Sequence, residues 1–186
     1  MISQIFDNNS FKVLALFALS PGSRFRRKEI KEKTRMNNIP LDSALSRLVS
    51  SGVVNKERNF YHINLENKHS EQIMNMISSQ HKQLKSLPLD VYFLITDVVT
   101  ELLPFKGTEI WLFGSYSKMI YKETSDIDIA LLESDTDKEH IKKIFRRLEK
   151  QYGKKIEEHF FERDGFYKNK NDPLVKDILQ NGTRLL

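Results

Sequence analysis

Two short apolar runs, each joined directly to a small polar motif, constrain the fold of the second half of this chain most strongly. The first run leads into Gly114 and Ser115, and the second follows Asp126-Ile127-Asp128. Apolar runs of this length, bounded by polar residues, predict buried β-strands. Because side chains alternate along a strand, Asp126 and Asp128 are expected on one face while Ile127 points into the core.

Two carboxylates held on one face of a half-buried strand repel each other and are costly to remove from water. A divalent cation relieves both costs, because Mg²⁺ prefers carboxylate oxygens and keeps waters and substrate phosphates as its other ligands. We therefore predict that Asp126 and Asp128 bind Mg²⁺ or Mn²⁺. Gly114 permits a close approach of the backbone, and Ser115 offers a hydroxyl and an amide to a phosphate.

The order of these motifs resembles the nucleotidyltransferase superfamily that includes DNA polymerase beta, and within it the minimal nucleotidyltransferases of bacteria and archaea. The family pattern is an apolar strand, Gly-Ser, a short spacer and Asp-x-Asp on the next strand. Residues 112–115 and 125–128 reproduce this pattern. The resemblance covers residues 88–186 and implies a small polymerase beta-like α/β nucleotidyltransferase domain.

The resemblance implies transfer of a nucleoside monophosphate from an NTP, with ATP the expected nucleotide, to an acceptor hydroxyl or phosphate. Two metal ions held by Asp126 and Asp128 would stabilise the charge on the α-phosphate and on the departing pyrophosphate. Gly114 and Ser115 would hold the β- and γ-phosphates. Lys118 is predicted to add a phosphate contact, and a solvated loop lysine is the alternative.

A third carboxylate from the next strand normally orients and deprotonates the attacking hydroxyl in this family. Residues 155–161 predict that strand. If Ile156 and Phe160 face the core, Glu157 and His159 share the other face. Glu157 is the predicted third catalytic residue, with an exposed strand glutamate as the alternative, and His159 is expected to be structural.

Two features depart from the family pattern. Many relatives carry Arg-Gly shortly after Gly-Ser, where this chain has Lys118-Met119, and the third strand offers Glu157 in place of an aspartate. The missing glycine predicts a different phosphate-binding loop. These departures support a second hypothesis, a transcriptional regulator whose nucleotidyltransferase domain is catalytically weak or inactive and serves nucleotide sensing or assembly.

The excess positive charge lies in the first third of the chain. Residues 1–66 contain eleven Lys and Arg against six Asp and Glu, whereas residues 67–186 contain nineteen of each, so the net charge of +5 belongs to the first segment. An excess of one sign in one segment indicates a nucleic-acid face. A solvated surface that happens to be basic is the alternative.

The same basic segment is predicted to form three helices followed by a β-hairpin. Apolar periodicity favours an amphipathic helix that ends at Pro21-Gly22, a polar helix over 27–35, and a third helix that ends at Gly52. Two short β-rich runs around a tip at 56–59 predict the hairpin. The segment is therefore expected to consist of three helices and a hairpin with a basic tip.

The order of these elements resembles the winged helix-turn-helix family. The resemblance implies that the third helix enters a major groove, while the second helix and the hairpin contact phosphates. Protein contacts or dimerisation are the alternative use, because the fold does not dictate the function. The predicted DNA-binding residues are Arg26, Arg27, Lys28, Lys31, Asn38, Ser43, Arg47, Lys56 and Arg58.

The predicted fold class is therefore α+β, with a winged helix-turn-helix at 1–66, a connector helix at 67–87 and a nucleotidyltransferase domain at 88–186. The connector has a thin apolar stripe, and an interdomain lever, a dimer helix and a plain linker all remain open. The chain has no cysteine, which excludes disulfides and thiolate metal sites. It has no apolar run near the roughly 20 residues of a membrane span and no secretory signal, so a cytoplasmic protein is expected.

The resemblance also implies partners. Some minimal nucleotidyltransferases are antitoxins that add AMP to a HEPN-domain toxin encoded beside them, and an attached winged helix suits repression of the shared promoter. A HEPN-type toxin protein and a second copy of this chain are therefore candidate partners, besides NTP and DNA. Transfer to tRNA or to a small molecule such as an aminoglycoside is a further possibility that no residue favours.

Overall fold

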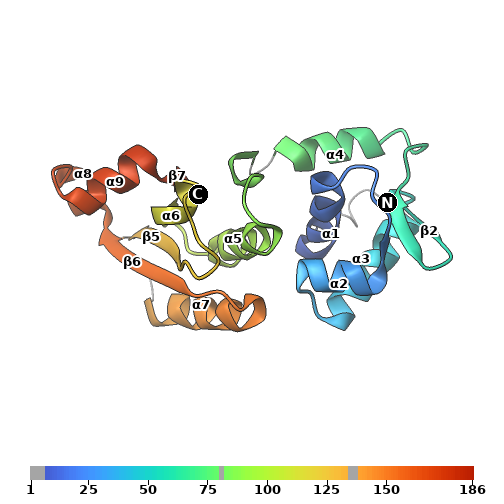
Figure 1. Ribbon diagram of the computed structural model, residues 1–186, viewed down its shortest axis with the longest axis horizontal. Helices are drawn as coiled ribbons and strands as arrows, with labels where there is room; N and C mark the ends of the chain where they lie inside the picture. The colour runs from blue at the N-terminus through green and yellow to red at the C-terminus, as the bar shows by residue number, and fades with distance from the viewer. Residues whose placement is uncertain (1–6, 80–81, 134–137) are drawn as a thin grey trace. The chain divides into compact units, whose positions relative to one another are not determined.

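Figure 1 shows the computed structural model of the chain, which describes residues 7–79, 82–133 and 138–186. The chain divides into two compact units, Met1–Lys85 and Ser86–Leu186, and each has its own sheet and its own buried core. Within the described ranges, no helix combines the length and the apolar character that crossing a membrane would need. Helices and sheets in both units confirm the predicted α+β class.

The helices of the first unit pack around α1 (Asn8–Leu19), whose residues from Val13 to Phe17 are all buried. Its N-cap is Asp7, whose side chain accepts hydrogen bonds from backbone amides of the first turn. Helices α2 (Arg27–Thr34), α3 (Asn38–Ser50) and α4 (Ser70–Ser79) contact α1. The predicted helices of this segment are therefore present, and they enclose one core.

A three-stranded antiparallel sheet completes the first unit. Strands β1 (Phe25–Arg26), β2 (Val54–Glu57) and β3 (Phe60–Ile63) lie in the order β1-β3-β2. The predicted hairpin is present, and it is tighter than expected, since its strands extend until only Arg58 and Asn59 remain in the turn. Arg58 has a φ of 52°, so the exposed tip has a left-handed backbone.

The segment predicted as a connector contains α4 and the short 3-10 helix η2 (Lys82–Leu84). Helix α4 buries Ile73 and Ile77 and packs against α1. Residues 80–81 of this segment, and residues 1–6 of the predicted first domain, lie outside the described residues.

The second unit is built on a four-stranded mixed sheet in the order β6-β5-β4-β7. Strands β4 (Glu109–Phe113) and β5 (Ile127–Glu133) are antiparallel, whereas β5 and β6 (Ile156–Glu162) are parallel. Helix α7 (Lys138–Tyr152) therefore makes the crossover connection that a parallel pair requires. The two-residue strand β7 (Thr183–Arg184) pairs with β4 at the other edge.

Helices cover the two faces of this sheet. Helix α5 (Leu89–Leu102) packs with α7, and Figure 1 shows α7 on the opposite side of the sheet from α8 (Arg163–Lys168) and α9 (Pro173–Asn181). The α8 and α9 side is held by a cluster of Phe113, Ala130, Leu132, Phe166, Val175 and Ile178. Helix α8 and strand β7 were not expected from the sequence. Because Ala130 and Leu132 share their face of β5 with Asp128, this is also the side that carries the predicted site.

Candidate functional site

The register of the central sheet brings two predicted catalytic side chains together. Asp128 lies opposite Phe113 of β4 and opposite Glu157 of β6. Two residues further along the same face, Ala130 lies opposite His159. The ligand atoms of Asp128, Glu157 and His159 all lie within 4.8 Å of one another. The sheet therefore gathers two carboxylates and an imidazole at the point where β5 begins.

The Gly-Ser motif forms a tight turn against the same carboxylate. Strand β4 passes directly into the short helix α6 (Gly114–Ser117), and Gly114 has a φ of 69°, a left-handed conformation that suits glycine. A Cβ atom at Gly114 would overlap the Asp128 carboxylate, whose Cγ would lie 2.7 Å away. The backbone amide of Ser115 donates a hydrogen bond to Asp128. The two sequence motifs therefore form one structure.

The electrostatic environment of Asp128 favours a bound cation. Burial raises the pKa of the Asp128 carboxyl above its ordinary value, and the negative charge of Glu157 raises this pKa further. His159 and the Ser115 amide oppose that shift, and Asp126 adds to it. A divalent cation bound here would replace repulsion with attraction, so the donors present fit Mg²⁺ or Mn²⁺.

Asp126 lies outside the close group formed by Asp128, Glu157 and His159. Its Oδ2 atom accepts a hydrogen bond from Nζ of Lys155 at 3.0 Å, and this carboxylate raises the pKa of the lysine. The strict alternation that was expected for Asp126 holds only within a strand, and β5 begins one residue later, at Ile127. Asp126 is close enough to influence the pKa of Asp128, but its nearest charge is an ammonium group.

Lys118 lies at the end of α6, and its predicted contact with phosphate remains a prediction. Its Nζ atom is 2.7 Å from Oδ1 of Asp177 on α9, and the hydrogen bond from Lys118 lowers the pKa of that aspartate. Met119 follows with a φ of 57°. The chain therefore keeps, at the position where relatives carry glycine, the left-handed conformation that a glycine adopts without strain.

Sequence reasoning expected His159 to be structural, and the structure gives it a place beside the carboxylates. Its ring meets the Phe113 ring edge to face, with centroids 5.2 Å apart, and its Nε2 lies 3.5 Å from Oε1 of Glu157. Alternation along 155–161 placed His159 on the same face as Glu157. The register that brings both opposite β5 has no signal in the sequence.

Some of the predicted DNA-binding residues are exposed, and others are paired with side chains of the first unit. Arg27 binds Asp42 through two hydrogen bonds, of 2.6 and 2.8 Å, and reaches Asn38 at 3.3 Å. Arg47 donates to Asp7 at 3.1 Å, so its guanidinium is used within the unit. Asn38 and Ser43 are exposed on α3.

The remaining predicted cations lie on β1, on α2 and on the hairpin. Arg26 lies over the Phe60 ring at 5.1 Å, and Lys56 over the Tyr61 ring at 5.6 Å. Lys28 is 3.9 Å from Glu32, a weak pair. For Lys31 and Arg58, the described residues supply no ion-pair partner. The hairpin and α2 therefore offer several cations to an anionic ligand.

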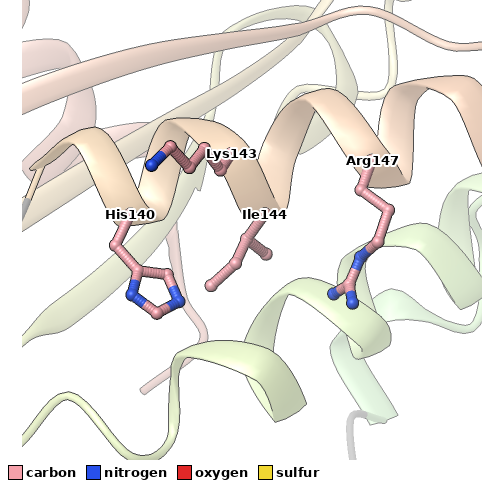
Figure 2. A pocket seen from close by; sticks show the side chains of 4 residues that line it. All are labelled: His140, Lys143, Ile144 and Arg147. Atoms are coloured by element: carbon pink, nitrogen blue, oxygen red, sulfur yellow. The ribbon is translucent and has the colours of Figure 1, made fainter.

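A groove of about 360 Å³ elsewhere in the second unit contains no predicted site residue. Figure 2 shows its lining by His140, Lys143, Ile144 and Arg147, all on α7. Arg147 is bound to Glu101 at 2.8 Å, and the His140 ring meets that of Phe105 edge to face. The groove is a basic surface feature of α7, apart from the group around Asp128.

Comparison with known families gives this geometry its context. The nucleotidyltransferase domain family matches residues 94–186, a range that includes both motifs and the strands β4, β5 and β6. The chain belongs to the nucleotidyltransferase domain family, which confirms that part of the sequence prediction and implies an NTP substrate. No curated protein and no solved structure matches the chain.

Proposed function

We propose that this chain is a metal-dependent nucleotidyltransferase that moves NMP from an NTP, with ATP the expected donor, to a protein or other acceptor. The observation that carries the proposal is the convergence of Asp128 and Glu157 beside the Gly114-Ser115 turn. This convergence lies inside the residues that match the family. A HEPN-type toxin protein is the candidate acceptor that the family resemblance suggests.

Each residue of the site has a proposed task. Asp128 and Asp126 would hold the cation, and Asp126 would exchange its ammonium partner Lys155 for the metal. The Gly114-Ser115 turn would bind the β- and γ-phosphates, with Lys118 in reach of them after leaving Asp177. When bound, the divalent cation would supply positive charge to the α-phosphate and the leaving pyrophosphate.

Glu157 is the proposed third carboxylate of this reaction. It would accept a hydrogen bond from the acceptor hydroxyl and hold it for attack on the α-phosphate, taking its proton as the new bond forms. Its position opposite Asp128 supports this task, because the hydroxyl, the cation and the α-phosphate must meet within a few ångströms.

Transfer of label from ATP tests the reaction. Full-length protein is incubated with Mg²⁺ or Mn²⁺, candidate acceptors and ATP labelled at the α-phosphate. Label should appear on an acceptor, whereas ATP labelled at the γ-phosphate should transfer none, because that phosphate leaves with pyrophosphate. The Asp128→Asn variant should transfer no label. Labelling by γ-labelled ATP alone would indicate a kinase, and no labelling of any acceptor by α-labelled ATP would contradict the proposal.

We further propose that the first unit binds DNA. The support is the confinement of the net charge to residues 1–66 and the exposed cations of α2 and the hairpin. Phosphate contacts release counterions, so affinity should fall steeply as salt rises. A mobility-shift titration at several salt concentrations measures this fall. Absence of binding at low salt would contradict the proposal.

A regulator with a weak or inactive catalytic domain is the second candidate function. The pairing of Asp126 with Lys155 favours it, because an internal ammonium already neutralises a predicted metal ligand. The double substitution Asp126→Asn and Asp128→Asn separates the candidates. If the chain acts as an enzyme, the double variant should lose its activity in the cell. If the chain is a regulator that acts through DNA, the double variant should retain repression and DNA affinity.

A further inference from the structure

We propose that His159 supplies a nitrogen ligand to the cation of this site, so that Asp128, Glu157 and His159 form a mixed oxygen and nitrogen donor set. Such a set binds divalent transition metals such as Mn²⁺, Co²⁺ and Zn²⁺ in preference to Mg²⁺, because imidazole suits them and Mg²⁺ favours oxygen alone. This inference rests on the proposed function, and it departs from the carboxylate pair that the sequence predicted.

The distances within the group fit a single ion. Nitrogen and oxygen ligands bind such metals at about 2.0–2.2 Å, so two ligands of one ion lie at most about 4.4 Å apart. The donor atoms of Asp128, Glu157 and His159 lie within 4.8 Å of one another before any metal has drawn them together. Small side-chain rotations are therefore sufficient to close the site.

The surroundings of His159 direct its ring toward the carboxylates. His159 lies opposite Ala130, whose methyl side chain leaves space on that row of the sheet. Its ring rests edge to face on Phe113, which lies directly opposite Asp128. The Nε2 atom is on the side of Glu157, 3.5 Å from its Oε1. The packing thus positions a nitrogen atom beside the carboxylates.

The pairing of Asp126 with Lys155 explains why His159 would take this place. With its Oδ2 held at 3.0 Å by the ammonium group, Asp126 is not among the donors that lie close together. A first cation would therefore meet Asp128, Glu157 and His159, and Asp126 would join only after Lys155 moves away. The chain replaces one carboxylate of the predicted pair with an imidazole.

Pulsed electron paramagnetic resonance of Mn²⁺ bound to the full chain, without nucleotide, tests the nitrogen ligand directly. A metal-bound imidazole produces nitrogen modulation, and this signal should change when the protein is labelled with ¹⁵N-histidine. The His159→Gln variant should lose the signal and bind Mn²⁺ at least about tenfold more weakly. The His140→Gln variant, which alters a histidine on α7 outside the site, should retain both.

Each outcome decides between the inference and the function on which it rests. Bound Mn²⁺ without nitrogen modulation, no bound Mn²⁺, or wild-type affinity in His159→Gln would each overturn the inference. If His159→Gln fails to fold, the ¹⁵N-histidine experiment on the wild type still decides, since it needs no variant. Label transfer from α-labelled ATP without nitrogen modulation would retain the proposed function and reject the histidine ligand. Nitrogen modulation without label transfer would retain the histidine ligand and reject the proposed function.

Discussion

The two units of this chain differ in how far their charged side chains are paired within the unit. In the first unit, several basic side chains are bound by carboxylates of the same unit, as Arg27 is by Asp42 and Arg24 by Glu57. In the second unit, Asp128 and Glu157 lie side by side on neighbouring strands. Glu157 pairs with His159, and no Lys or Arg in the described part of the chain forms an ion pair with either carboxylate. The basic surface is partly compensated by carboxylates of its own unit, whereas the acidic group has only the His159 imidazole beside it.

Because of this difference, the two units make different demands on a ligand. Basic side chains that are already paired must exchange their carboxylate partners for phosphates, so the affinity for DNA is reduced by the pairs that break. A group of carboxylates without a counterion is destabilising until a cation arrives. The second unit therefore depends on its ligand more strongly than the first.

The largest expected effect follows from Gly114→Ala. A Cβ atom would displace the Asp128 carboxylate and would also strain a backbone with a φ of 69°. A misplacement of about 1 Å at a reacting centre can cost about 100-fold in rate, and we expect a loss of at least that size in label transfer. Gly107→Ala is the matched control, because Gly107 has a φ of 83° with nothing within 4 Å. Equal losses in the two variants would show that strain alone is responsible.

The carboxylate of Glu109 provides a contrast within the same sheet, because it is buried and fully compensated. It binds Arg163 at 2.6 Å, the Tyr167 hydroxyl at 2.8 Å and Arg184 at 3.5 Å. Glu109→Gln should lower the free energy of unfolding by about 2–3 kcal/mol, since charged hydrogen bonds are lost in a buried place. Urea unfolding at neutral pH measures this change in the free energy of unfolding. An unchanged free energy of unfolding would mean that the ion pairs of Glu109 do not stabilise the fold.

Asp128→Asn should stabilise the fold, whereas Glu109→Gln should destabilise it. The pKa of Asp128 is raised chiefly by burial, so its ionised form is less favourable in the folded chain than in the unfolded chain. Removing the charge should raise the melting temperature without metal while abolishing label transfer. The expected rise should vanish in saturating Mn²⁺, which stabilises only the wild type. A lower melting temperature in the variant, measured in EDTA, would contradict the uncompensated site.

A smaller effect is expected when a carboxylate is removed from the first unit. Asp42→Asn should free the Arg27 guanidinium, tighten DNA binding and steepen the salt dependence by about 0.9 in the log–log slope. Glu32→Gln changes the net charge equally, but its pair with Lys28 is only a loose 3.9 Å contact. If both variants tighten DNA binding equally, net charge rather than release of Arg27 is the cause.

The smallest expected effect is on how the stability of the first unit depends on acidic pH. The hydrogen bond from Arg27 holds the pKa of Asp42 below its ordinary value of 3.8. The pair therefore stabilises the fold fully above that value, and its contribution is lost as pH falls through the lower folded-state pKa. Between about pH 4 and pH 2, the unfolding free energy of Asp42→Asn should depend less steeply on pH than that of the wild type. Parallel curves would show that the pair contributes nothing.

The sequence predicted the features that depend on neighbours along the chain. The apolar periodicity of α7 and the direct passage of β4 into Gly114 and Ser115 are local properties, and the structure has them where they were expected. The family match confirms the resemblance that these motifs suggested. Short elements were missed, since α8 contains Gly165 and begins from Glu162 at the end of a strand.

Features that depend on register and tertiary pairing could not be predicted from local patterns. Helix α7 separates β5 from β6, so only the family resemblance, and no pattern of the residues themselves, indicated that Glu157 would join Asp128. The same register moved His159 from an expected structural role to the side of the carboxylates. The pair of Lys155 with Asp126 joins residues far apart in the chain, and charge counts alone cannot reveal it.

Nucleotide binding by the full chain reports on the metal-dependent site of the second unit without any knowledge of the acceptor. Calorimetric titration with ATP should show binding in Mn²⁺ or Mg²⁺ that weakens at least about tenfold in EDTA or in Asp128→Asn, since the carboxylates bind nucleotide only through a cation. Binding of equal affinity with and without metal, or unchanged binding in Asp128→Asn, would contradict a metal-dependent nucleotide site in the second unit.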